Sequence, residues 1–195
     1  MTLATMHWEP VSVHKVISSA LVAEQKNIES RLQSQITPAR LSNLLGMPNF
    51  ASPLENHMRL RLLCLLKGPL LAELPPDTQW YEVRHLTDNE LSELNVIAQI
   101  RWDHPDHKNE LANVAKRTPY ALHERPSMWK PIILWGHEKH GPFTIVEGNH
   151  RLIAYASSGL RELKIPVFIG LSLSMFYFHI HDPRRWVAND LFNVG

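Results

Sequence analysis

The feature that most constrains the fold is a succession of structural signals between residues 143 and 170. Phe143-Thr144-Ile145-Val146 is rich in β-branched and aromatic residues, as strands are. Gly148 then permits a sharp bend, and an apolar run at 152–156 has the composition of a buried helix. The run at 165–169 reads as another strand. We therefore expect a strand, a tight turn, a helix and a strand, which is a mixed α/β (α+β) arrangement.

Further strand signals lie on both sides of this segment. Runs at 80–86, 131–135 and 175–180 are aromatic or β-branched, and a charged turn is expected at 137–141. Thr87-Asp88-Asn89-Glu90 has the pattern of a capping box, which predicts a helix that buries Leu91, Leu94 and either Ile97 or Ala98. Residues 101–130 are expected to form a long irregular connection.

The first seventy residues have a helical pattern instead. Apolar residues recur at spacings of four and seven at Val13, Ile17, Leu21, Ile28 and Leu32. Helix starts are predicted at Thr37-Pro38 and at Ser52-Pro53-Leu54-Glu55, with stops at Gly46 and Gly68. We interpret this region as a packing or interaction layer without chemistry of its own.

Composition narrows the class of protein. Hydrophobic residues make up 44% of the chain, enough for a packed core. Twenty Lys and Arg face nineteen Asp and Glu, whereas general DNA-binding proteins carry a basic excess, so DNA is not an expected partner. No signal peptide or membrane-spanning stretch is evident, which predicts a cytoplasmic protein. The single cysteine, Cys64, excludes an internal disulfide and is expected to be buried and inert.

The turn from Glu147 to Arg151 is the strongest functional candidate. Asn149 suits the N-cap of the following helix, which places His150 and Arg151 in its first turn. Cations there oppose the helix dipole unless an anion binds, and backbone N–H groups, a guanidinium and an imidazole together suit a phosphate. The alternative is that Arg151 pairs with Glu147 and His150 is structural. The residues alone leave both interpretations open.

The segment Phe143-Thr144-Ile145-Val146-Glu147-Gly148-Asn149-His150-Arg151-Leu152-Ile153-Ala154-Tyr155-Ala156, followed by Ile165-Pro166-Val167, resembles the ParB/sulfiredoxin superfamily. The resemblance covers residues 130–172 and extends less clearly back to Trp80. It implies a ParB/sulfiredoxin-like domain over residues 76–195 and a helical extension over 1–75.

Members of that superfamily use this turn to hold nucleotide phosphates. The resemblance therefore implies that Gly148, Asn149, His150 and Arg151 bind the phosphates of ATP or CTP. It places Glu147 beside the metal, Mg²⁺, and the phosphate. Asn149 stands where sulfiredoxins have a cysteine, so reduction of sulfinic acids is not expected. Only residues 171–195 follow the motif, too few for the helix-turn-helix domain of ParB proteins.

Several other groups are weaker candidates. Glu82, His85 and Asp88 surround the first strand of the domain, and one of them is a candidate general base for an acceptor hydroxyl. His104 with His107, and His179 with His181, have spacings compatible with a metal, against a default of surface polar residues. His137 and His140 are expected to be solvated.

Taken with these observations, the resemblance implies a nucleotide-binding protein that transfers or hydrolyses phosphate, with Glu147, His150 and Glu82 as catalytic candidates and a small-molecule acceptor. Two alternatives remain. One is a non-catalytic regulatory module that forms a homodimer through its N-terminal helices. The other is a ParB-like nuclease, which DNA cleavage lost in His150→Ala would reveal.

Overall fold

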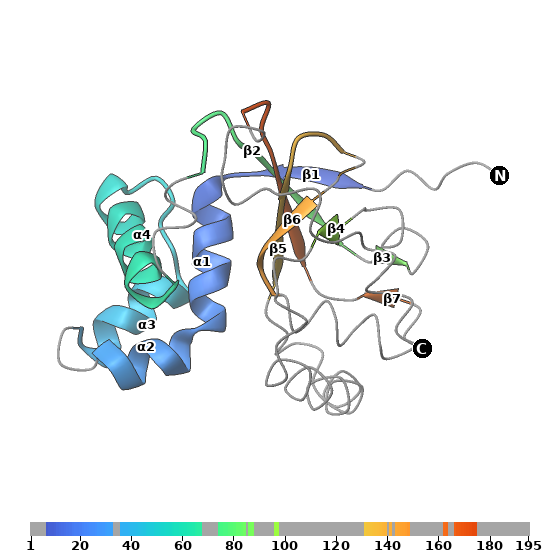
Figure 1. Cartoon of the computed structure of the whole chain (residues 1–195). Coiled ribbons are helices and arrows are strands. Elements are labelled where there is room, and N and C mark those ends of the chain that lie inside the picture. Colours follow the sequence, from blue (N-terminus) through green and yellow to red (C-terminus); the bar gives the residue numbers. More distant parts are fainter. Residues whose placement is uncertain are drawn as a thin grey trace. The chain divides into compact units, whose positions relative to one another are not determined.

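The computed structural model describes residues 7–32, 36–67, 74–84, 86–87, 96–97, 131–139, 141, 143–148, 162–163 and 166–174 (Figure 1). The chain divides into two compact units, which are described separately. A helical unit comprises residues 11–74. A sheet unit comprises residues 1–10 together with residues 75–195.

The helical unit contains α1 (Val13–Ala23), α2 (Gln25–Leu32), α3 (Pro38–Gly46) and α4 (Pro53–Lys67) among its described residues. Helix α1 packs against α3 and α4. The buried apolar residues that form this core are Val16, Ile17, Ala20, Leu21, Ile28, Leu41, Leu44, Leu45, Leu62 and Leu63. The apolar spacing predicted from Val13 onward is thus divided between two helices, which meet at Glu24. Cys64 is half-buried, less enclosed than predicted.

Hydroxyl side chains begin three of these helices. Each accepts a hydrogen bond from the backbone N–H three residues on: Ser12 from Lys15 (3.2 Å), Thr37 from Arg40 (3.3 Å) and Ser52 from Glu55 (3.3 Å). The starts predicted at Thr37 and Ser52 are confirmed. The capping box at Ser52 is only half formed, because the Glu55 carboxylate accepts from the N–H of Asn49 at 3.1 Å. Helix α4 is described as far as Lys67, and Gly68 lies outside the described residues.

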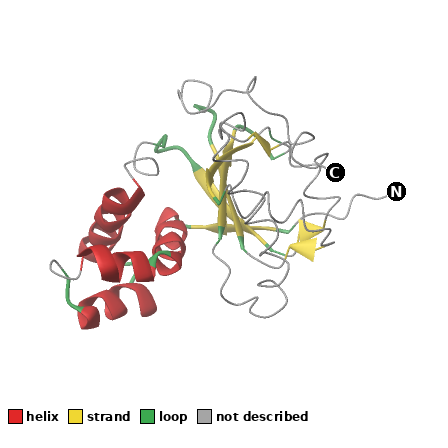
Figure 2. Cartoon of the chain, turned by 60° about the horizontal axis from the view of Figure 1, so that its bottom comes forward, coloured by secondary structure: helices red, strands yellow, loops and turns green. Residues whose placement is uncertain are grey.

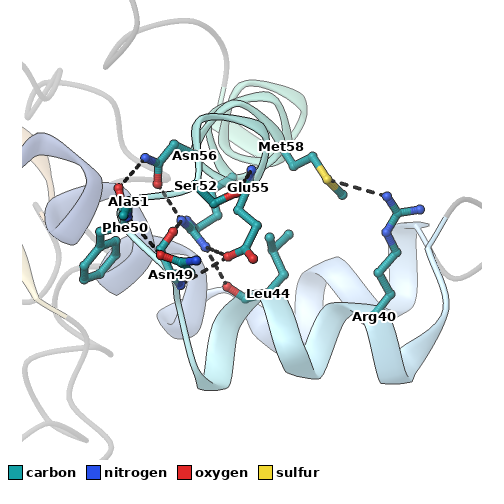
Figure 3. A network of polar contacts seen from close by, with 10 residues as sticks. Arg40, Leu44, Asn49, Phe50, Ala51, Ser52, Glu55, Asn56 and Met58 are labelled. Carbon is teal, nitrogen blue, oxygen red and sulfur yellow. Dashed lines mark hydrogen bonds and ion pairs between the residues drawn. The ribbon is translucent and has the colours of Figure 1, made fainter.

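A buried arginine joins α3, the connecting loop and α4. Arg59 is fully buried, and its guanidinium donates to four oxygens: Leu44 O (3.3 Å), Glu55 Oε2 (3.1 Å), Asn49 O (3.0 Å) and Asn56 Oδ1 (2.5 Å). Figure 3 shows these acceptors gathered from the end of α3, the loop and the start of α4. Because a buried guanidinium is costly without partners, this network holds the loop in one conformation.

The sheet unit is built on a six-stranded mixed sheet with the order β1-β2-β8-β5-β6-β4 (Figure 2). Its strands are β1 (Trp8–Val11), β2 (Gln79–Val83), β4 (Val96–Ile97), β5 (Ile132–Gly136), β6 (Phe143–Glu147) and β8 (Val167–Leu171). Strand β8 is antiparallel to β2 and parallel to β5, while β6 is antiparallel to β5 and parallel to β4. A separate two-stranded sheet pairs β3 (Leu86–Thr87) with β7 (Glu162–Leu163). The mixed α/β class is therefore confirmed.

The core of the sheet lies in its middle strands. Every residue of β5 is buried, as are the first four residues of β8. Gly170 pairs with Trp80 in the neighbouring strand, and a Cβ added at Gly170 would lie 2.9 Å from the Trp80 ring and from Thr78 Cγ2. The glycine thus makes room for the indole against the sheet.

Two secondary-structure predictions are corrected. Trp8–Val11 form an edge strand of the sheet, although the beginning of the chain was expected to be helical. Ile97 belongs to β4 and pairs with Thr144, although it was expected on a helix. Val96 and Ile97 are both β-branched, which favours the strand. The predicted helix at 152–156, the predicted connection at 101–130 and the predicted strand at 175–180 fall on residues outside the described ranges. No helix in the described ranges is long and apolar enough to cross a membrane.

Candidate functional site

The end of β6 departs from regular strand pairing. Ile133 pairs with Glu147, but the next residue of β5, Leu134, pairs with Ile145. Val146 is thus an extra residue on β6, as in a β-bulge, and both Val146 and Glu147 are half-buried. Such irregularities bend a strand and redirect its side chains, and they are frequent beside functional sites. The irregularity immediately precedes the candidate turn.

Gly148 follows β6 directly and is buried, with a φ of 100°. At such a positive φ a Cβ atom clashes with the backbone, so glycine adopts this conformation much more readily than other residues. The structure thus shows at Gly148 a backbone conformation that favours glycine, as expected for this position. Strand β6 includes Glu147, one residue beyond the expected end at Val146. Asn149, His150 and Arg151 lie outside the described residues, so their predicted phosphate contacts remain predictions.

Glu82 lies on β2, next to the edge strand β1, and forms an ion pair with Arg84. Its side chain is 3% exposed, and Oε1 accepts a 2.6 Å bond from Nε of Arg84, whose side chain is 57% exposed. That hydrogen bond and the negative charge of Glu82 raise the pKa of the Arg84 guanidinium above its usual value, despite a small opposing effect of burial. A buried carboxylate therefore orients an exposed guanidinium.

Glu82 and Glu147 lie in one row across the sheet. Glu82 pairs with Phe168, Phe168 with Ile133, and Ile133 with Glu147. Three strand spacings separate the two acids, which is about 14 Å at the usual distance between neighbouring strands. Strands β2 and β6 run in the same direction, so Arg84 and Gly148, which follow these strands, both lie at the C-terminal ends of β2 and β6.

Sequence reasoning did not single out Arg84, the partner of Glu82. The available signal was its spacing from Glu82, because residues two apart on a strand lie on the same face and opposite charges there attract. Of the other candidates, His137 is half-buried in the turn after β5, more enclosed than expected. His85, Asp88, His104, His107, His140, His179 and His181 lie outside the described residues. Within the described ranges, no three His, Cys, Asp or Glu side chains gather as a metal site would require.

Comparisons with models of protein families, with curated proteins and with solved structures found no match to this chain.

Proposed function

We propose that this chain binds a nucleoside triphosphate through the turn that follows β6, and that the sheet unit has a ParB/sulfiredoxin-like fold. The observation that carries the proposal is the backbone of Gly148, which is buried, has a φ of 100° and follows β6 within the sequence Glu147-Gly148-Asn149-His150-Arg151. A glycine with positive φ between a strand and a following segment allows close approach of a ligand to the backbone.

The chemistry of the turn suits phosphate. Asn149 would cap the next segment and leave backbone N–H groups directed at the anion, while Arg151 supplies a planar guanidinium able to grip two oxygens. His150 adds a second donor. These three residues are the next three after Gly148 in the sequence, so the backbone conformation of Gly148 sets the direction in which this segment leaves β6.

Mg²⁺ fits this arrangement as a partner of the nucleotide. Mg²⁺ is commonly held by one or two carboxylates together with substrate phosphates, and it keeps several waters. Glu147, half-buried at the end of β6, is the carboxylate next to the proposed phosphate position. A bound Mg²⁺ would supply charge neutralisation of the phosphates. Glu147 would orient it, and the turn would hold the anion.

Calorimetric titration with ATP, CTP and ADP in the presence of Mg²⁺ tests the proposal. Arg151→Ala should weaken binding by about 1.5–3 kcal/mol, the usual value of hydrogen bonds to a charged group, which is at least about tenfold in Kd. Arg40→Ala is a matched control, since it removes the same charge from an exposed site on α3 where the guanidinium contacts Met58 Sδ at 3.6 Å. Binding in that variant should be unchanged.

Absence of heat with all three nucleotides, or equal losses in Arg151→Ala and Arg40→Ala, would refute the proposal. Turnover is measured separately from the same samples by following the formation of ADP or CDP. Formation of a diphosphate, with or without an added acceptor, identifies a hydrolase or transferase. Tight binding with the triphosphate recovered intact identifies a nucleotide-responsive binding module.

A further inference from the structure

A corner of two aromatic rings lies where the edge strand β1 meets β2 in the sheet unit. Trp8 on β1 and Tyr81 on the neighbouring strand β2 have ring centroids 5.6 Å apart and planes inclined by 74°. Both side chains are half-buried. The Tyr81 hydroxyl donates to Gln79 Oε1 at 3.0 Å, which holds the tyrosine ring in place. Two fixed rings at a steep angle form two walls of a site.

A cation already occupies this corner. Nζ of Lys139 lies 5.4 Å from the centroid of Trp8 and 5.5 Å from that of Tyr81, within the usual range of a cation–π contact with both rings. Lys139 comes from the turn between β5 and β6, where the N–H of Gly141 donates to Glu138 O at 3.1 Å. Among the described residues, no hydrogen bond or ion pair holds its ammonium group.

A lysine is a poor occupant for such a corner. Its ammonium is compact and strongly hydrated, and its three N–H donors gain no partner from the faces of rings. A methylated ammonium has the same charge, has no donors to leave unsatisfied when fully methylated, and offers methyl groups that pack against both rings. Quaternary ammonium recognition is the established use of aromatic walls of this kind.

We propose that the Trp8–Tyr81 corner is a binding site for a methylated ammonium group, and that Lys139 occupies it as an internal substitute that the ligand displaces. The site is independent of the proposed nucleotide site, because the turn containing Lys139 precedes β6 whereas Gly148 follows that strand. Two sources share this chemistry: a small free cation such as choline, and a methylated lysine on another protein.

Saturation-transfer NMR with the full chain tests the proposal. Choline is compared with 3,3-dimethylbutan-1-ol, which has the same shape and no charge. Choline should bind, and its neutral analogue should not. Lys139→Ala should tighten choline binding by about three- to sixfold, because it removes an internal competitor of the strength usual for an exposed cation–π contact. Trp8→Leu and Tyr81→Leu should each abolish binding, and circular dichroism verifies that each variant is folded.

Equal binding of choline and its neutral analogue would overturn the proposal. So would full choline binding in folded Trp8→Leu or Tyr81→Leu, or an absence of binding in both the natural chain and Lys139→Ala. Binding of a short peptide that contains trimethyllysine, compared with the same peptide carrying unmodified lysine, then distinguishes a methylated protein from a small free cation as the ligand. If the modified peptide binds more tightly than choline and the unmodified peptide does not bind, the ligand is a methylated protein. If choline binds at least as tightly as the peptide, the ligand is a small free cation.

Discussion

Replacement of Gly148 by alanine isolates the strain that the proposed turn imposes on its backbone. Gly148 is buried with a φ of 100°, well beyond the left-handed helical region near +57° that a few non-glycine residues tolerate. Gly46 provides a matched control. It ends α3, its φ lies outside the glycine-favouring range, and an added Cβ there has no atom within 4 Å.

The changes in unfolding free energy caused by Gly148→Ala and Gly46→Ala share one contribution and differ in another. Both make the unfolded chain less flexible, which stabilises the protein by about 0.4–1 kcal/mol. Only Gly148→Ala places a Cβ in an unfavourable backbone conformation, at a cost of about 1–3 kcal/mol. Gly46→Ala should therefore be stabilising. The difference between the two changes in unfolding free energy cancels the shared contribution, and it should equal the strain, about 1–3 kcal/mol.

The chain offers a separate optical signal for each unit. All six tryptophans, at positions 8, 80, 102, 129, 135 and 186, belong to the sheet unit, whereas the described helices belong to the helical unit. Urea unfolding followed by tryptophan fluorescence therefore measures Gly148→Ala, and circular dichroism at 222 nm measures Gly46→Ala. If Gly148→Ala is as stabilising as Gly46→Ala, the turn is unstrained and the argument for its special backbone fails. If the turn holds phosphate, Gly148→Ala should also weaken nucleotide binding.

Three further substitutions test the packing described above. Arg59→Met should lower the unfolding free energy of the helical unit by about 1–3 kcal/mol in urea titrations followed by circular dichroism, because it removes the donor from buried oxygens; Arg40→Met, at an exposed site, should change it by less than about 0.5 kcal/mol. Gly170→Ala should destabilise the sheet unit by about 1–3 kcal/mol in fluorescence-detected unfolding, since its Cβ would meet an indole at 2.9 Å. Arg84→Met should cost about 1–3 kcal/mol by the same assay, because it removes a charged hydrogen bond from the buried carboxylate of Glu82. A cost for Arg59→Met no larger than for Arg40→Met, or no measurable cost at Gly170 or Arg84, would contradict the corresponding contact.

Local chemistry was enough to predict much of this fold. The helix starts at Thr37 and Ser52 follow from a hydroxyl placed before a proline. Strands β5 and β6 follow from short apolar runs rich in β-branched and aromatic residues. The special backbone conformation of Gly148 was predicted from the position of this glycine between a strand and a predicted helix. In each case the determining residues are neighbours in the sequence.

Features that depend on distant partners were not predicted. Trp8–Val11 contain a proline and show no strong strand pattern, and they become a strand because β2 offers an edge. The role of Arg59 depends on carbonyls up to fifteen residues away that the fold brings together. Lys139 meets Trp8 and Tyr81 only because the turn after β5 lies near β1 and β2. Sequence spacing carries none of this information.

The register of the sheet also separates two of the acidic candidates, Glu82 and Glu147. A general base must lie within about 2.6–3.2 Å of the proton it removes, directly or through one water. The backbones of Glu82 and Glu147 are about 14 Å apart across three strand spacings, so the two acids are not neighbours on the sheet. If a phosphate binds at Gly148 as proposed, Glu147 is the acid that precedes it in the chain. Glu82, in contrast, is buried and bound to the exposed guanidinium of Arg84, which it orients.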